Sequence, residues 1–81
     1  MKRDKLEIIR SILLICQNGG AKKTKIVYKA NLNFKTADVY LKLLMDQQMI
    51  IKESMSFRTT PKGAELLANL KEVSASLDLR R

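Results

Sequence analysis

The sequence predicts a mainly α-helical domain with one small β-hairpin, in the order helix, helix, helix, hairpin, helix. Apolar residues recur at helical spacing in four segments of the 81-residue chain. Between residues 49 and 60 this spacing is lost, and two short stretches of strand character take its place. The segments are separated by residues that start or stop helices, namely Gly19-Gly20, Asn31, Asn33 and Thr60-Pro61.

The first helix is expected from about Asp4, its N-cap, to Gln17, before the glycine pair. Its apolar face consists of Leu6, Ile9, Ile12, Leu13 and Cys16. Ile8 and Ile15 widen this face to about half of the circumference at about 100° per residue. So wide a surface fits either a central helix that its own domain covers on two sides, or a helix that meets a second subunit with one side.

The second helix is expected from about Thr24 to Ala30, after a short connection at residues 19–23. Thr24 is a suitable N-cap, and Asn31 can take the left-handed conformation that ends a helix. The residues that face inward are Ile26, Val27 and Ala30. Only three residues, of which Leu32 turns into the core, separate this helix from the next one. Two helices joined so closely predict a helix-turn-helix.

The third helix is expected from about Phe34 to Gln48, with Asn33 as its N-cap. With Leu41 taken as the inward direction, the inner stripe consists of Phe34, Ala37, Leu41, Leu44, Met45 and Gln48. The opposite side is basic and hydroxylic with two apolar residues. It consists of Lys35, Thr36, Val39 and Leu43, with Tyr40 and Lys42 on its flanks.

The hairpin is expected to have strands at Met49–Glu53 and Phe57–Thr60, joined by a turn at 54–56. Lys52 and Arg58 flank its tip, and the acidic Glu53 lies next to them.

The last helix is expected from Pro61 to about Leu77, with Thr60 as its N-cap, while residues 74–81 fray. Its apolar residues form one seam of coiled-coil type, made of Leu66, Leu70, Val73 and Leu77. This order of elements is that of a winged helix-turn-helix. Residues 1–81 are expected to form a single domain whose helix 61–78 serves dimerisation, with help from Ile8 and Ile15.

The basic charge is concentrated on the helix-turn-helix. The formal net charge is +8, and the window from Gly20 to Lys42 holds six lysines against one acid, Asp38, a net +5. The six are Lys22, Lys23, Lys25, Lys29, Lys35 and Lys42. Such a concentration predicts contact with the phosphates of double-stranded DNA. Lys52 and Arg58 of the hairpin are then expected to touch the DNA backbone or the adjacent minor groove. Glu53 opposes deep entry, so phosphate contacts are expected more than minor-groove readout.

The two helices of the pair have different expected roles: the first crosses the DNA backbone and the second lies in the major groove. Lys22, Lys23 and Lys25 surround the start of the first, where N–H groups also attract phosphate. Lys35 is either a solvated lysine or a contact to phosphate or guanine. Thr36 is either a helix-start residue or a reader of a base through its hydroxyl and methyl groups.

The remaining outward residues allow two interpretations each. Val39 and Leu43 either contact thymine methyl groups or are covered by another subunit. Tyr40 either packs with its hydroxyl at the rim or contacts a phosphate. Asp38 either pairs with Lys42 at i+4 or accepts a hydrogen bond from a cytosine amino group.

The composition gives enzyme chemistry little to use. There is no histidine and only one cysteine, and no glycine-rich phosphate loop, so no catalytic residue, cofactor or metal site is predicted. Cys16 is interpreted as a small core residue, with a nucleophile or redox sensor as the alternative. No apolar run of membrane-spanning length and no signal peptide are found. The lone cysteine fits a reducing cytoplasm, where the protein is expected to be nucleoid-associated.

Four stretches resemble a known family, the small basic archaeal winged-helix DNA-binding proteins, which include chromatin-associated dimers. They are "KLEIIRSIL" from Lys5, "NGGAKKTKIVYKANLNF" from Asn18, "YLKLLMDQQMI" from Tyr40 and "FRTTPKGAELL" from Phe57. The resemblance implies a winged helix, double-stranded DNA binding, and a homodimer formed by antiparallel C-terminal helices. Two departures are a shorter C-terminal helix, and Thr59 where a leucine is commoner.

A transcriptional regulator is the function that these observations favour. The alternatives are an architectural chromatin protein with little sequence specificity and a winged-helix module that docks a protein partner. The mixed chemistry of Thr36, Val39, Tyr40 and Leu43 favours the regulator over the architectural protein.

Overall fold

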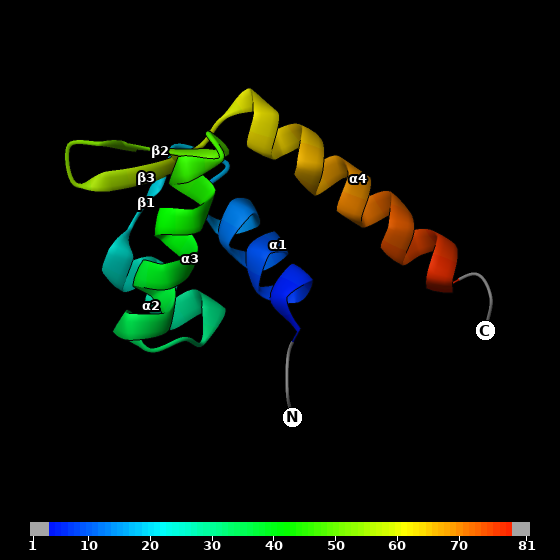
Figure 1. The fold of residues 1–81 in the computed structure, drawn as a ribbon, viewed down its shortest axis with the longest axis horizontal. Helices are drawn as coiled ribbons and strands as arrows, with labels where there is room; N and C mark the ends of the chain where they lie inside the picture. The colour runs from blue at the N-terminus through cyan, green and yellow to red at the C-terminus, as the bar shows by residue number, and fades with distance from the viewer. Residues whose placement is uncertain (1–3, 79–81) are drawn as a thin grey trace.

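The computed structural model describes residues 4–78, and from residue 71 onward the path of the backbone only. This part of the chain forms four helices and a three-stranded antiparallel sheet in the order β1-β3-β2 (Figure 1). The elements are α1 (Lys5–Ile15), β1 (Ala21–Lys22), α2 (Lys23–Ala30), α3 (Phe34–Asp46), β2 (Ile50–Glu53), β3 (Ser56–Thr59) and α4 (Pro61–Asp78). The predicted fold class, a mainly α-helical winged helix-turn-helix, is confirmed.

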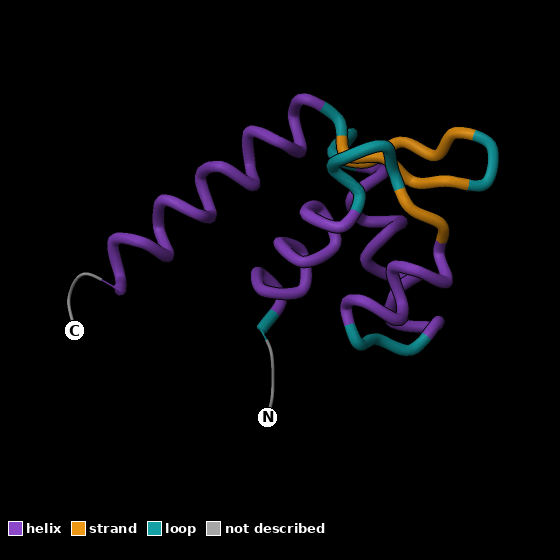
Figure 2. The backbone as a smooth tube through the Cα atoms, turned by 180° about the vertical axis from the view of Figure 1, so that it is seen from behind, coloured by secondary structure: helices purple, strands orange, loops and turns teal. Residues whose placement is uncertain are grey.

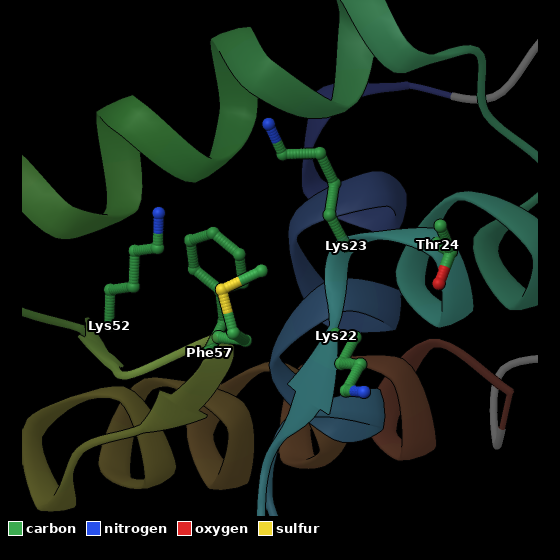
Figure 3. A pocket seen from close by; sticks show the side chains of 6 residues that line it. Lys22, Lys23, Thr24, Lys52 and Phe57 are labelled. Carbon is green, nitrogen blue, oxygen red and sulfur yellow. The ribbon is translucent and has the colours of Figure 1, made fainter.

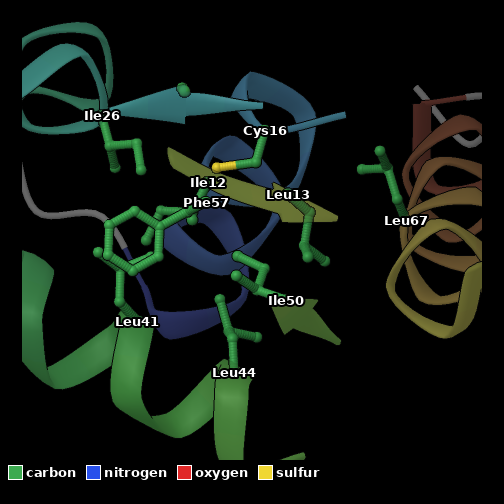
Figure 4. Close-up of a cluster of buried hydrophobic side chains, with 10 residues drawn as sticks. Ile12, Leu13, Cys16, Ile26, Leu41, Leu44, Ile50, Phe57 and Leu67 are labelled. Carbon is green, nitrogen blue, oxygen red and sulfur yellow. The ribbon is translucent and has the colours of Figure 1, made fainter. Parts of the chain in front are cut away.

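Helix α1 is the central element of the fold. It lies between the α2–α3 pair and α4, as Figures 1 and 2 show. Its own domain therefore covers it on two sides, which is the first of the two interpretations of its wide apolar face. The buried cluster around it is drawn in Figure 4 and joins all four helices to the sheet; its largest side chains are Ile12, Leu13, Ile26, Leu41, Leu44, Ile50 and Leu67, with Phe57 from β3.

Side-chain caps define the starts of three helices as the sequence predicted. Asp4 accepts a hydrogen bond from the Glu7 N–H at 2.8 Å, and Asn33 accepts one from the Thr36 N–H at 2.7 Å. Thr60 Oγ1 accepts from the Gly63 N–H at the start of α4. Asn31 ends α2 with φ +57°, the left-handed conformation expected of it.

Strand β1 is not predicted from the sequence, and α2 begins one residue earlier than expected, at Lys23. Ala21 pairs with Phe57 and Lys22 with Ser56, so β1 is a third strand beside the β2–β3 hairpin. This hairpin, residues 50–59, is the wing of the fold. Because β1 leads directly into α2, the N-cap position falls on Lys22, which makes no side-chain capping bond, and the predicted cap Thr24 lies inside the helix. Two residues are too few to show an alternating pattern.

Three residues expected to face inward are exposed instead. Leu6 and Phe34 are 58% and 52% exposed. Each stands in the first turn of its helix, where a side chain leans towards the N-terminus and so past the end of the core. Gln48 lies beyond the end of α3, at φ +62°, and its side chain is exposed.

Candidate nucleic-acid interface

The outer face of α3 is the surface that the sequence analysis proposed for DNA. Ala37, Leu41 and Leu44 are buried on the inner side. On the outer side the exposed residues are Lys35, Val39, Lys42 and Leu43. Val39 is 62% exposed and Leu43 is 44% exposed. Thr36 and Tyr40 are half-buried on one flank, and Tyr40 packs against the core. The outer face therefore combines two lysines with two apolar side chains.

Helix α2 adds a second exposed face, which the sequence analysis described only by its lysines. Ile26 and Ala30 are buried, so Lys25 and Lys29 project into solvent on the other side. Tyr28 lies on the same exposed side and is 85% exposed, the largest exposed fraction among the exposed large apolar residues. Its position three residues after Lys25 and opposite Ile26 could have identified it. A phenol in that position can stack on a sugar or donate to a phosphate.

An ion pair connects α2 to α3. Lys23 Nζ lies 2.5 Å from Asp38 Oδ1. Pairing of Asp38 with Lys42, within its own helix, is one of the two interpretations that the sequence allows, and in the structure Asp38 pairs with Lys23 instead. Asp38 lies on the flank of α3 that faces the start of α2, because α2 and α3 pack together. The only acid of the basic window is thus already engaged with one of the six lysines.

The wing is a tight hairpin whose charges are partly neutralised. Glu53 pairs with Ser56 across a two-residue turn in which Ser54 has φ +59°. Arg58 donates to Glu53 at 2.6 Å, so the arginine of the wing is also engaged with an acid. Lys52 lies over the ring of Phe57, with its Nζ 5.5 Å from the ring centroid, a cation–π contact. Met55, at the tip, is exposed.

A hollow separates the wing from the start of α2. It is lined by Lys22, Lys23, Thr24, Lys52, Met55 and Phe57. Figure 3 shows Lys23 and Lys52 pointing to the same side, one on each side of the Phe57 ring, with α3 running past both amines. Lys22 points the other way. The fold therefore brings together Lys23 and Lys52, which lie 29 positions apart in the sequence, and it directs Lys22 elsewhere.

The residues predicted to serve dimerisation belong to α1 and α4. Ile8, Ile15 and Leu66 are half-buried and pack against the core, and Leu70 is half-buried. Val73 and Leu77 lie where only the backbone is described. Helix α4 diverges from α1 towards its C-terminal end (Figures 1 and 2).

Cys16 behaves as a core residue. Its side chain is fully buried, and desolvation raises the pKa of the thiol to about 11. The thiol is therefore protonated and inaccessible at neutral pH, which favours packing over the nucleophile or redox alternatives. Among the residues that the structure describes, no three potential metal ligands lie together. In the same part of the chain, no helix has the length and apolarity needed to span a membrane.

Two relatives come from the archaeon Methanocaldococcus jannaschii. The chain is 45% identical over 73 residues to the uncharacterized protein MJ0290, covering 90% of this chain and 35% of MJ0290. It is 35% identical over 72 residues to the uncharacterized protein MJ0287, covering 89% of this chain and 74% of MJ0287. The chain thus spans about a third of the length of MJ0290.

A solved structure has a similar fold. The crystal structure of T. acidophilum IdeR superposes with a TM-score of 0.63 over 78% of this chain and 31% of the IdeR chain, at 23% identity. The likeness in sequence is low, so the comparison bears on the fold. A family model described as winged helix-turn-helix matches residues 2–77. This match extends over nearly the whole chain, and the chain therefore belongs to the winged helix-turn-helix family.

Proposed function

We propose that this chain binds double-stranded DNA as a transcriptional regulator, with α3 in the major groove. The observation that carries the proposal is the exposed basic side of the helix-turn-helix. Lys25, Lys29, Lys35 and Lys42 are all exposed, and no carboxylate of the described residues is ion-paired with them. Amines placed in this way are available to DNA phosphates, whose neutralisation supplies most of the affinity.

The proposed contacts divide between the two helices and the wing. Lys35 and Lys42 reach phosphates or guanine from α3, while Val39 and Leu43 contact thymine methyl groups. Lys25 and Lys29 contact the backbone that α2 crosses. Lys52 reaches the backbone from the wing, next to the hollow. In the wing, Arg58 shares its charge with Glu53 and contributes less.

The acting species is proposed to be a homodimer joined through α4. The seam from Leu66 to Leu77 has coiled-coil spacing in the sequence, and the second half of α4 diverges from α1 (Figure 1). Two DNA-binding units would then contact half-sites about one helical turn apart, or a multiple of that distance.

Affinity for duplex DNA as a function of salt tests the proposal. Between about 50 and 200 mM salt, log affinity should fall linearly with log salt, by about 0.9 per phosphate contact. No binding at the lower concentration would refute DNA binding. Selection of bound duplexes from a random pool then separates a regulator from an architectural protein. A regulator should prefer its selected site by about a thousandfold or more.

A protein-docking module is the second candidate, and the exposed Val39, Leu43 and Phe34 favour it. Reversal of charge at Lys25, Lys29 and Lys35 separates the two functions. It should abolish DNA binding, whereas a partner held by apolar contacts would remain bound.

A further inference from the structure

Asp38 is the one carboxylate within the basic window, residues 20–42. It lies beside Lys23, which lines the hollow next to the wing. Lys23 and Asp38 come within 2.5 Å, and their side chains are 38% and 57% exposed. Solvent therefore reaches both groups, and so would a phosphate arriving at the hollow. The amine of Lys23 points towards α3 (Figure 3).

We propose that Asp38 competes with the DNA backbone for Lys23 and so limits the affinity of this chain for DNA. In the free protein the carboxylate takes the place that a phosphate oxygen would occupy. The proposal rests on the proposed function, because it concerns how strongly the same surface binds DNA.

The energetics allow such an exchange. An ion pair between exposed side chains is weak, since water and salt screen it. A contact between the same lysine and a backbone phosphate releases a condensed counterion. When the phosphate takes Lys23, Asp38 is left unpaired close to DNA and has to recruit a cation. The binding free energy that Lys23 gains from the phosphate is therefore largely offset by the unpaired charge of Asp38.

Asp38 thereby changes the balance between contacts to phosphates and contacts to base edges. Phosphate contacts carry no sequence information, whereas contacts from Val39 and Leu43 to base edges do. By withholding one phosphate contact, Asp38 lowers affinity for every sequence equally and leaves the base contacts with a larger share. On the wing, Arg58 is a second exposed cation that is already paired with an acid, Glu53.

The test uses Asp38→Asn, with Asp46→Asn as a matched control. Asp46 is an exposed acid on the same helix, outside both ion pairs that the described residues form, so its substitution changes the net charge equally without releasing a lysine. The full chain is titrated against a fluorescent duplex of mixed sequence at several salt concentrations. Thermal melting verifies that each variant is folded.

The competition predicts that Asp38→Asn binds on the order of tenfold more tightly at 50 mM salt, with a slope of log affinity against log salt steeper by about 0.9, because one phosphate contact is added. Asp46→Asn should change both much less. In a chain that also carries Lys23→Gln, the excess effect of Asp38→Asn over Asp46→Asn should vanish. If Asn at this position disturbs folding, Asp38→Ser, which removes the same carboxylate, is expected to give the same result.

Equal effects of Asp38→Asn and Asp46→Asn, or an excess that persists with Lys23→Gln, would overturn the competition. In either case the unmodified chain still binds the duplex, and the proposed function stands. Absence of binding by the unmodified chain at 50 mM salt would overturn both.

Discussion

The hydroxyl of Thr59 donates a hydrogen bond of 2.7 Å to the carbonyl oxygen of Leu13, 46 positions earlier in the chain. The N–H of Thr59 also donates to the carbonyl oxygen of Cys16, at 3.1 Å. Both acceptors lie at the C-terminal end of α1, where carbonyl groups lack partners within the helix. Threonine at this position therefore fixes the wing to the central helix, which a leucine could do only through its backbone.

Substitution of Thr59 by valine should lower the free energy of unfolding by about 1–2 kcal/mol, because the half-buried carbonyl of Leu13 loses its donor while the side-chain shape is kept. Thr59→Ser keeps the hydroxyl and is the control. Urea denaturation measures both. A valine variant as stable as the serine variant would show that the hydrogen bond contributes nothing.

Gly63→Ala should destabilise the fold by about 1–3 kcal/mol, although alanine is the better helix former. A Cβ at Gly63 would clash with the carbonyl oxygen of Met49 and lie 2.8 Å from Thr59 Cγ2, so the backbone has to shift to make room for it. Asn69→Ala, at an exposed position of the same helix, should instead stabilise slightly. Thermal melting of both variants shows whether each one is less or more stable than the unmodified chain. A stabilised alanine variant at position 63 would contradict this close approach.

Cys16 should resist thiol reagents in the folded protein and react at once in denaturant. Burial raises the pKa of the thiol to about 11, above its ordinary value of 9.0. The stability associated with this shift is present below about pH 9 and is lost as pH rises towards 11, at up to about 1.4 kcal/mol per pH unit, because the unfolded thiol ionises first. Cys16→Ala lacks this component. Urea denaturation of both proteins at pH 8 and pH 10 should show the larger decline for the unmodified chain, and equal declines would argue against it.

Lysines at Val73 and Leu77 should convert the proposed homodimer into a monomer, since the seam cannot bury two charges. Lysines at Ala68 and Ala75, on the opposite side of the helix by its about 100° spacing, add the same charge without entering the seam. Sedimentation equilibrium compares the two pairs. Identical subunit numbers for both pairs would remove α4 from the interface.

Much of this fold follows from local patterns in the sequence. Asp4, Asn33 and Thr60 each cap the helix predicted for them, because the preference of these side chains for N-cap positions depends on nearby backbone alone. The two wing strands were predicted to within one residue at their boundaries. Of the predicted inner stripe of α3, Ala37, Leu41 and Leu44 are buried, whereas Phe34 and Gln48 are exposed. Periodicity of 2 and of 3.6 residues reports directly which side is buried.

The features that escaped prediction depend on contacts between distant segments. Strand β1 exists because Ala21 finds Phe57, 36 positions later, and two residues carry no pattern of their own. Asp38 pairs with Lys23 because α2 packs beside α3, whereas sequence spacing offered only Lys42. The hollow between Lys23 and Lys52 likewise requires the sheet and α2 to be placed relative to each other.

The central claim is that the outer face of α3 binds DNA, and charge reversal at equal net charge tests it most directly. Lys35→Glu with Lys42→Glu alters that face, whereas Lys5→Glu with Lys62→Glu alters exposed residues of α1 and α4 by the same amount. With a duplex of mixed sequence at about 50 mM salt, where phosphate contacts contribute most, the α3 pair should abolish measurable binding. The control pair should lower affinity only slightly. Equal loss in both pairs would show that overall charge alone, and not the face of α3, attracts DNA.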